Sequence, residues 1–326
     1  MPGLGIRAPS VGWKPAQLAL SAAFLFGAHA AGAAAWPSLL ALFGGERALF
    51  CWGTFALHVS LLLSLNGALA VLYTARLPAV EACKISPKPW PWRSPSADER
   101  ARFWRSTAAS LATVAFNNVA VALPSTFSTY DLVAPHGMLP AGAAAFPALA
   151  TVVWQVAACA VVEDVLFYHF HRFLHTPAIY GYVHKWHHQW SHSIGIASET
   201  AHPVEFYLGN LVPLLAGPLL VRAHVFTLWV WLAVRIFETV DAHCGYDFPW
   251  SPARLTPWTN STAAHDYHHA HNKGCYGSMF SVLDALYGTD ADFEAAIKAG
   301  ADGAGESGGD APPPATRAPR RQRVAA

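Results

Sequence analysis

The residues of this chain that can do chemistry are its histidines. Of the 17 histidines among 326 residues, 14 lie between His169 and His271. Three strings in that stretch, FYHFHRFLHTP, VHKWHHQW and AAHDYHHAH, repeat spacings of three and four residues. Side chains three or four residues apart share one face of a helix, so each string can aim several imidazoles at one point. Because imidazole is a common metal ligand, the strings predict a metal site.

Eight histidines occupy these spacings, and an ordinary core or surface position does not explain three such strings. They are His171 and His175, then His184, His187 and His188, and finally His265, His268 and His269. Eight imidazoles exceed the four ligands of one tetrahedral zinc ion and suit two neighbouring ions. Nitrogen ligands suit iron, copper, nickel or zinc, so the residue types leave the element open.

Acidic residues near the strings are candidates for orienting the rings. A carboxylate that accepts the second N–H of a ligating histidine fixes its tautomer and direction. An ordinary structural pairing is the alternative role for each of them. The candidates are Glu163, Asp164, Glu199, Glu205, Glu238, Asp241 and Asp266.

The elements that must position the histidines are membrane helices. Hydrophobic residues make up 53% of the chain and charged residues only 13%. Four runs without any charge (15–45, 48–75, 106–130 and 132–162) each exceed the roughly 20 residues that span a bilayer. We therefore predict an all-α integral membrane protein with about four transmembrane helices, at approximately 18–44, 49–73, 107–124 and 142–162.

Two shorter uncharged runs follow, at 206–221 and 223–234. Pro213, Gly217 and Pro218 interrupt the first of them, which favours a re-entrant or in-plane hairpin over 206–234. Two buried helices of a soluble core are the alternative.

The distribution of positive charge predicts the orientation. The loop 76–105 holds seven Lys and Arg residues, whereas 124–141 holds none, so the loop is expected on the cytosolic side. We therefore predict a membrane region over 1–160 and a histidine-box region over 161–290. The histidine-box region is expected on the cytosolic side. A cleaved signal peptide is the alternative for the first run. The tail 300–326 has few large apolar residues and is predicted to be disordered.

Several other classes of protein are excluded. A formal net charge of +1 shows no basic excess for binding nucleic acid. Five cysteines without a CxxC pair argue against a disulfide scaffold or a zinc ribbon. No GxGxxG or P-loop string is present, so any electrons must come from another protein.

Longer strings around the histidines resemble one known family. EDVLFYHFHRFLH, VHKWHHQW, SETAHPVEF, RIFETVDAHCGYDFPW, HDYHH and YGSMFSVLDALYGTD follow one another over roughly 160–290. In order and spacing they resemble the fatty-acid hydroxylase (sterol desaturase) superfamily of membrane histidine-box diiron enzymes, and most closely its C-4 methylsterol monooxygenases. TPWTNSTAA and NKGC depart from that pattern, so the loops that face the substrate are expected to differ.

The resemblance implies metal ligation by the eight histidines and adds His243 as a ninth ligand and His202 as a tenth. The position of Asp247 is His or Asp among relatives, which leaves its role open. The resemblance further implies two Fe ions, O2 as co-substrate, and electrons from NAD(P)H through cytochrome b5 or a similar carrier and its reductase.

The implied reaction is oxidation of a sterol C-4 methyl group in the endoplasmic reticulum membrane, alongside other sterol C-4 demethylation enzymes. Sterol C-5 desaturase, sterol side-chain hydroxylase and fatty-acid hydroxylase activities are alternatives with the same histidine strings. A non-catalytic metal-binding membrane protein is the alternative from another class.

Overall fold

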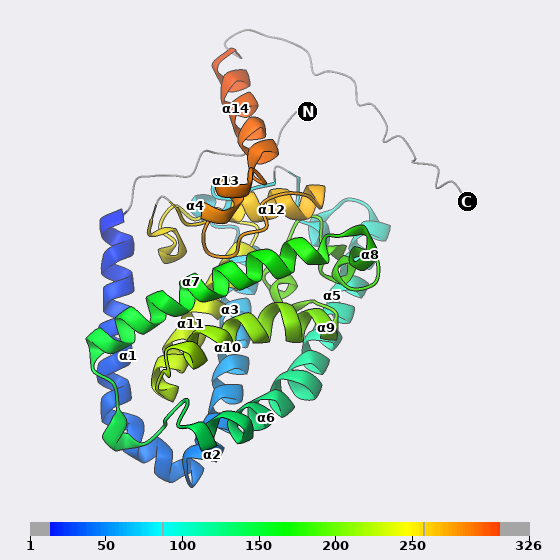
Figure 1. Cartoon of the computed structure of the whole chain (residues 1–326). Coiled ribbons are helices and arrows are strands. Elements are labelled where there is room, and N and C mark those ends of the chain that lie inside the picture. The colour runs from blue at the N-terminus through cyan, green and yellow to red at the C-terminus, as the bar shows by residue number, and fades with distance from the viewer. Residues whose placement is uncertain (1–13, 87, 257, 307–326) are drawn as a thin grey trace.

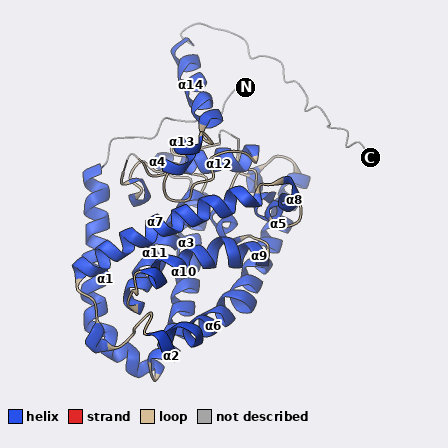
Figure 2. Ribbon diagram, viewed as in Figure 1, coloured by secondary structure: helices blue, strands red, loops and turns tan. Residues whose placement is uncertain are grey.

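A computed structural model of the chain describes residues 14–86, 88–256 and 258–306 (Figure 1). Within these residues every regular element is a helix (Figure 2). The only β pairing in the described ranges is two isolated bridges, Lys84–Tyr246 and Thr259–Phe280. The predicted all-α fold is therefore confirmed.

Five helical stretches of the described chain are long and apolar enough to cross a membrane. They are Lys14–Phe43, Glu46–Ala75, Ala97–His136, Leu149–Leu174 and Pro203–Leu220. The protein is thus a multi-pass helical membrane protein, and the first four stretches overlap the four predicted spans.

The fifth stretch covers the first arm of the predicted hairpin. Its helix begins at Pro203, before Glu205, whose charge had ended the uncharged run. Glu205 is buried against His184 rather than exposed, so its charge does not interrupt the apolar surface of this helix. The count of candidate spans is consequently five, one more than the sequence predicted.

Several of these stretches consist of more than one element. α1 (Lys14–Phe43) and α7 (Leu149–Leu174) are single helices. The others are α2 (Glu46–Ala48), η1 (Leu49–Gly53) and α3 (Thr54–Ala75); α5 (Ala97–Phe116), η3 (Asn117–Ala122), α6 (Leu123–Val133) and η4 (Ala134–His136); and α9 (Pro203–Glu205), η8 (Phe206–Leu211) and α10 (Val212–Leu220). η1, η3 and η8 are π-helical turns, which are rare and frequently occur at functional sites.

The remaining elements hold the long helices together and cap one end of them. α10 packs along α7, and α11 (Val225–Ala242) packs against α3 and α7 around a core that includes Trp36, Phe50 and Trp231. The cap contains α12 (Thr262–His271), α13 (Val282–Tyr287) and α14 (Ala291–Glu306), at the opposite end from α2 (Figure 1). The shorter elements are α4 (Pro78–Glu81), η2 (Pro91–Arg93), η5 (Ala143–Ala145), α8 (Pro177–Tyr180), η6 (His184–Gln189), η7 (Gly195–Glu199) and η9 (Pro252–Arg254).

The predicted disordered tail begins inside a helix. α14 continues to Glu306, so the first residues of 300–326 are helical. The rest of that tail, 307–326, lies outside the described residues.

Candidate metal centre

Three separate segments carry the histidine strings. His171 lies in the last turn of α7, one of the apolar helices, and His175 directly follows the end of that helix at Leu174. The second string forms η6, and the third lies on α12. α12 starts where the Ser261 hydroxyl accepts a hydrogen bond from the Ala264 amide. The second string is a 3-10 helix of six residues rather than the expected α-helix.

The nine histidines separate into two compact groups. The first contains His171, His175, His184, His188 and His268, and the second contains His187, His243, His265 and His269. Within each group, one ligand atom per residue lies within 4.8 Å of all the others. Each group can therefore hold a metal ion.

Both His-x2-His-His strings contribute to both groups. His184 and His188 join the first group, while His187 between them joins the second. The third string does the reverse, because His265 and His269 join the second group and His268 joins the first. The sequence predicted that the three imidazoles of each string lie together. Instead, each string gives two imidazoles to one group and one imidazole to the other.

The distances between ring nitrogens fit a metal. In the first group the Nε2 atoms of His175, His184, His188 and His268 form a ring with sides of 2.9, 3.0, 3.1 and 3.1 Å. In the second, Nε2 of His243 lies 2.9 Å from that of His265 and 3.4 Å from that of His187. Nitrogens bound to one ion at about 2.1 Å stand about 3.0 to 3.4 Å apart in square and tetrahedral arrangements.

Backbone carbonyls fix the orientation of most of these rings. A carbonyl only accepts, so each Nδ1 facing one must carry the proton and its Nε2 must carry a lone pair. The pairs are His171 with Tyr276 (2.9 Å), His187 with Thr200 (3.3 Å), His243 with Thr239 (2.7 Å), His268 with Gly274 (2.5 Å) and His269 with Trp190 (3.1 Å). Lone pairs that face one another at about 3 Å repel unless a cation lies between them.

Gly274, in the loop after α12, supplies one of these carbonyls. Its φ is +71°, and a Cβ atom there would lie 2.4 Å from the Thr289 carbonyl oxygen. Only glycine fits such a conformation and such a contact. The loop thereby turns the Gly274 carbonyl toward Nδ1 of His268.

Burial keeps the rings neutral. Loss of water lowers the pKa of His187 to about 4 and that of His175 to about 2. Ligating imidazoles must be neutral, so this environment favours metal binding near neutral pH. In addition, Nε2 of His171 is buried without a hydrogen-bond partner in the described chain, as expected of a nitrogen reserved for a metal.

Of the seven predicted orienting carboxylates, only Glu205 contacts a histidine of the two groups. Its Oε1 lies 2.7 Å from Nδ1 of His184. The other carboxylates were expected to accept from the Nδ1 atoms of the ligating rings. Backbone carbonyls do this instead for five of the nine rings.

The other six carboxylates have different partners. Glu163 and Glu238 pair with Arg235, and Asp164 accepts from the amides of Met279 and Phe280. Glu199 pairs with His58, Asp241 with Arg254 and Ser251, and Asp266 with His192. These contacts hold the helices and loops around the centre rather than the ligand rings.

His202 and Asp247 are not brought into either group. Nδ1 of His202 accepts from the Val204 amide and caps α9, and its ring packs against Trp186. Asp247 pairs with Arg254. His202 therefore stabilises the start of α9, and Asp247 balances the charge of Arg254.

A small cavity adjoins the centre. A cavity of about 30 Å³ is lined by histidines of both groups, including His171, His187 and His243. Its wall also contains Ser198, Asn210 and Thr239, none of which was singled out from the sequence. Ser198 and Thr239 belong to the strings SETAHPVEF and RIFETVDAHCGYDFPW, which were the available signal.

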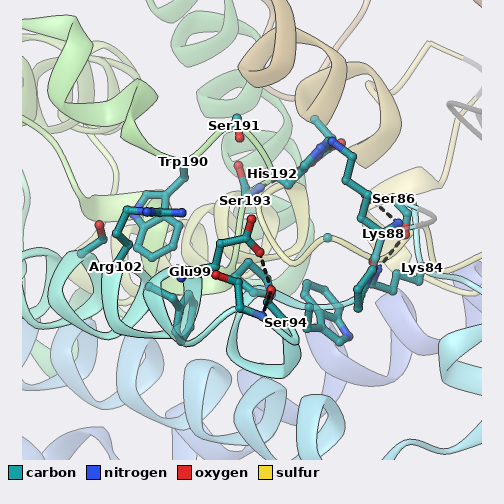
Figure 3. A pocket seen from close by; sticks show the side chains of 18 of the residues that line it. Lys84, Ser86, Lys88, Ser94, Glu99, Arg102, Trp190, Ser191, His192 and Ser193 are labelled. Atoms are coloured by element: carbon teal, nitrogen blue, oxygen red, sulfur yellow. Dashed lines mark hydrogen bonds and ion pairs between the residues drawn. The ribbon is translucent and has the colours of Figure 1, made fainter. Parts of the chain in front are cut away.

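A larger cavity of about 540 Å³ opens in the cap (Figure 3). None of the nine histidines lines it. Arg102 and Trp190 lie on one side of it, and Lys84 and Lys88 on the other (Figure 3). Trp190 connects it to the second group, since its carbonyl faces Nδ1 of His269.

The fold and the site together define a multi-pass helical membrane protein with a buried nine-histidine centre. A sequence model of the family Fatty acid hydroxylase matches residues 156–289, which include all nine histidines. The chain belongs to this fatty acid hydroxylase family. No solved structure matches it.

Curated relatives extend the similarity over most of the chain. A very-long-chain aldehyde decarbonylase of Oryza sativa subsp. indica is 38% identical over 266 residues, covering 79% of this chain and 91% of the relative. Methylsterol monooxygenase 2-2 of Arabidopsis thaliana is 33% identical and covers 78% of this chain and 90% of the relative. Methylsterol monooxygenase 2-1 of the same plant is 33% identical, with coverages of 78% and 93%.

Proposed function

We propose that this protein is an oxygen-dependent two-iron monooxygenase that oxidises a C-4 methyl group of a sterol. The observation that carries the proposal is the pair of histidine groups, each built to hold one ion, at the end of apolar helices. The strings shared with methylsterol monooxygenases and the relatives of that name support the substrate class. An oxidoreductase of the membrane fits both observations.

The protein's own residues prepare the centre. Histidines of the first group would hold one iron and those of the second group the other, and the bound irons would supply the activation of O2. The carbonyls of Thr239, Gly274 and Trp190 keep the rings in the tautomer that points Nε2 inward. Burial of the rings excludes water from the space where a methyl group would react.

The proposed reaction requires an electron donor and an enzyme that uses its product. Conversion of methyl to alcohol, aldehyde and carboxylate takes one O2, two electrons and two protons at each step and releases water. The electrons come from NAD(P)H through an external carrier such as cytochrome b5 and its reductase. The carboxylated sterol must then pass to a decarboxylating enzyme, so other sterol C-4 demethylation enzymes are proposed partners in the endoplasmic reticulum membrane.

The large cavity of the cap is the proposed face for the electron carrier. Lys84, Lys88 and Arg102 outnumber Glu99 and Asp266 in its lining, and this excess of positive charge favours an acidic partner (Figure 3). Trp190 lies in the same wall and its carbonyl faces the ring of His269. Between a carrier bound there and the second histidine group, Trp190 is the residue that contacts both the cavity and His269.

A second candidate function is chemistry on very-long-chain aldehydes. The rice relative with that name is more identical to this chain than the two plant methylsterol monooxygenases described above. Sterol C-5 desaturation, side-chain hydroxylation and fatty-acid hydroxylation would use the same nine histidines. A non-catalytic metal-binding role would need the same centre without turnover.

Lipid analysis of cells that lack the protein distinguishes these functions. The proposal expects sterols with intact C-4 methyl groups to accumulate and to disappear when the wild-type chain is restored. The His187→Ala variant, expressed at equal level, serves as the matched control and should not restore the sterols. Accumulation of very-long-chain aldehydes with a normal sterol profile would instead favour the second candidate.

A further inference from the structure

Three small cavities form a row that starts at the histidine centre. Their volumes are about 30, 40 and 50 Å³. The first and second share walls formed by Ser198, Asn210, Arg235 and Thr239. The second and third share His58, Leu211 and Leu214. Because neighbouring cavities share walls, the three lie next to one another in the protein.

The row connects the metal centre to the interior of the apolar helices. Its first cavity touches histidines of both groups, including His184 and His265. Its third cavity is lined by Phe55, Thr129 and Leu215, which belong to three different membrane-spanning candidates. A lipid that enters between these helices would therefore reach both histidine groups without crossing the polar cap.

The three π-helical turns of the described chain all line this row. η1 contributes Phe50, η3 contributes Ala122, and η8 contributes Phe206, Asn210 and Leu211. π-helical turns are rare and frequently occur at functional sites. Their presence around one row of cavities, from three separate spans, marks the row as a functional feature.

A buried hydroxyl on the row, that of Ser198, has no hydrogen-bond partner within the described residues. His58 and Asn118 hydrogen-bond to Glu199, and Arg235 pairs with Glu163. The Ser198 hydroxyl, in contrast, is buried, with the residue 6% exposed, and has no hydrogen-bond partner within the described ranges. A buried hydroxyl without a partner is unfavourable, so such a group calls for a ligand. Ser198 lines both the first and the second cavity.

We propose that this row is the substrate route and that the Ser198 hydroxyl binds the C-3 hydroxyl of the sterol. The inference rests on the proposed function. In a 4-methylsterol the C-3 hydroxyl sits on the carbon next to C-4, so its binding group must lie beside the metal centre. Ser198 meets this requirement, because it shares the first cavity with His187 and His243.

The rest of the row suits the apolar body of a sterol. Phe206, Leu211, Leu214 and Ile236 line the second cavity. The cavities are much smaller than a sterol, so the route has to widen when substrate enters. Leu211 and Leu214 line both the second and the third cavity, so movement of these two side chains would open the passage between them.

Binding of a sterol with and without its C-3 hydroxyl tests the role of Ser198. Equilibrium binding of radiolabelled 4,4-dimethylsterol and its 3-deoxy analogue is measured on the full chain in lipid nanodiscs. Ser198→Ala should weaken binding of the 3-hydroxy sterol by roughly 3- to 10-fold, the range of one neutral hydrogen bond, and leave the 3-deoxy analogue unchanged. Thr227→Val is the matched control, since Thr227 is another buried hydroxyl without a partner in the described chain and lines none of the three cavities.

Leu214→Trp tests the route independently of Ser198. It should weaken binding of both sterols, whereas Leu220→Trp, on a side chain of the same helix that is 72% exposed, should not. Melting temperature and iron content verify that each variant is folded.

Each contrary result has a separate meaning. An unchanged preference for the 3-hydroxy sterol in Ser198→Ala, or an equal loss for both sterols, overturns the assignment of Ser198. Unchanged binding in Leu214→Trp overturns the route. Failure of the iron-loaded wild-type protein to bind either sterol overturns the proposed function, and the inference with it.

Discussion

The Nε2 atoms of His243 and His265 lie 2.9 Å apart, although 22 positions separate the two residues in the chain. His243 stands at the end of α11 and belongs to none of the three histidine strings. Its Nδ1 faces the Thr239 carbonyl at 2.7 Å, which aims Nε2 at His265 and His187. The second group is thus completed by a residue whose role the resemblance implied and the repeated spacing did not.

Replacing His243 should empty the second group selectively. The His243→Ala variant is expected to bind about one iron per chain, against about two in the wild type, because the first group keeps all its ligands. Metal analysis of purified protein measures this ratio. His202→Ala is the control and should keep both irons, since His202 caps α9 away from the groups. Full iron content in His243→Ala would contradict the two-group assignment.

The nine histidines could be predicted from the sequence, but their division into two groups could not. Spacing along the chain reveals which imidazoles can share a helix face. The division depends on which strings cross in space, as when His268 meets His188 rather than His265. Only the tertiary arrangement contains that information.

The lengths of the helices also depend on tertiary contacts that the local sequence does not reveal. Uncharged runs predicted the apolar spans, but α7 continues past Glu163 and Asp164 to the first histidine string. Arg235 pairs with Glu163, and the amides of Met279 and Phe280 bind Asp164. Partners that are distant in sequence allow these charges to be buried, so a rule based on local charge ends the helix too early.

Glu205 should hold His184 in place for metal binding. Glu205→Leu removes the acceptor 2.7 Å from Nδ1 of His184 and should weaken metal binding by roughly 10- to 100-fold. Glu205→Gln keeps an oxygen that can accept, so its effect should be smaller. Competition with a chelator of known affinity measures both. Wild-type affinity in Glu205→Leu would show that the His184 ring needs no such support.

Charge reversal in the large cavity should affect the electron carrier alone. Lys88→Glu and Arg102→Glu should each lower the rate with an acidic protein carrier by about 3- to 10-fold at low salt, and less at high salt. Turnover with a small-molecule reductant should not change. Lys298→Glu, an exposed position on α14 outside the cavity, is the matched control. Equal rates with the carrier in all three variants would place the docking face elsewhere.

Glycosylation tests the sidedness of the centre. Asn260-Ser261-Thr262 is an acceptor sequence whose last residue begins α12, and it should stay unmodified if the centre faces the cytosol. An acceptor engineered beside His136, which ends the Ala97–His136 stretch, should gain a glycan. The gel shift after endoglycosidase treatment reports both. A glycan on Asn260 would reverse the orientation and separate the centre from a cytosolic electron carrier.

The most direct test of the central claim is turnover by the purified, iron-loaded protein. It is reconstituted with cytochrome b5, its reductase, NADPH and O2, and is given 4,4-dimethylsterol and a very-long-chain aldehyde in parallel. The proposal predicts 4-carboxysterol, formed through the alcohol and the aldehyde with consumption of O2, and no product from His187→Ala. An untouched sterol together with a very-long-chain aldehyde that loses its carbonyl carbon would contradict it.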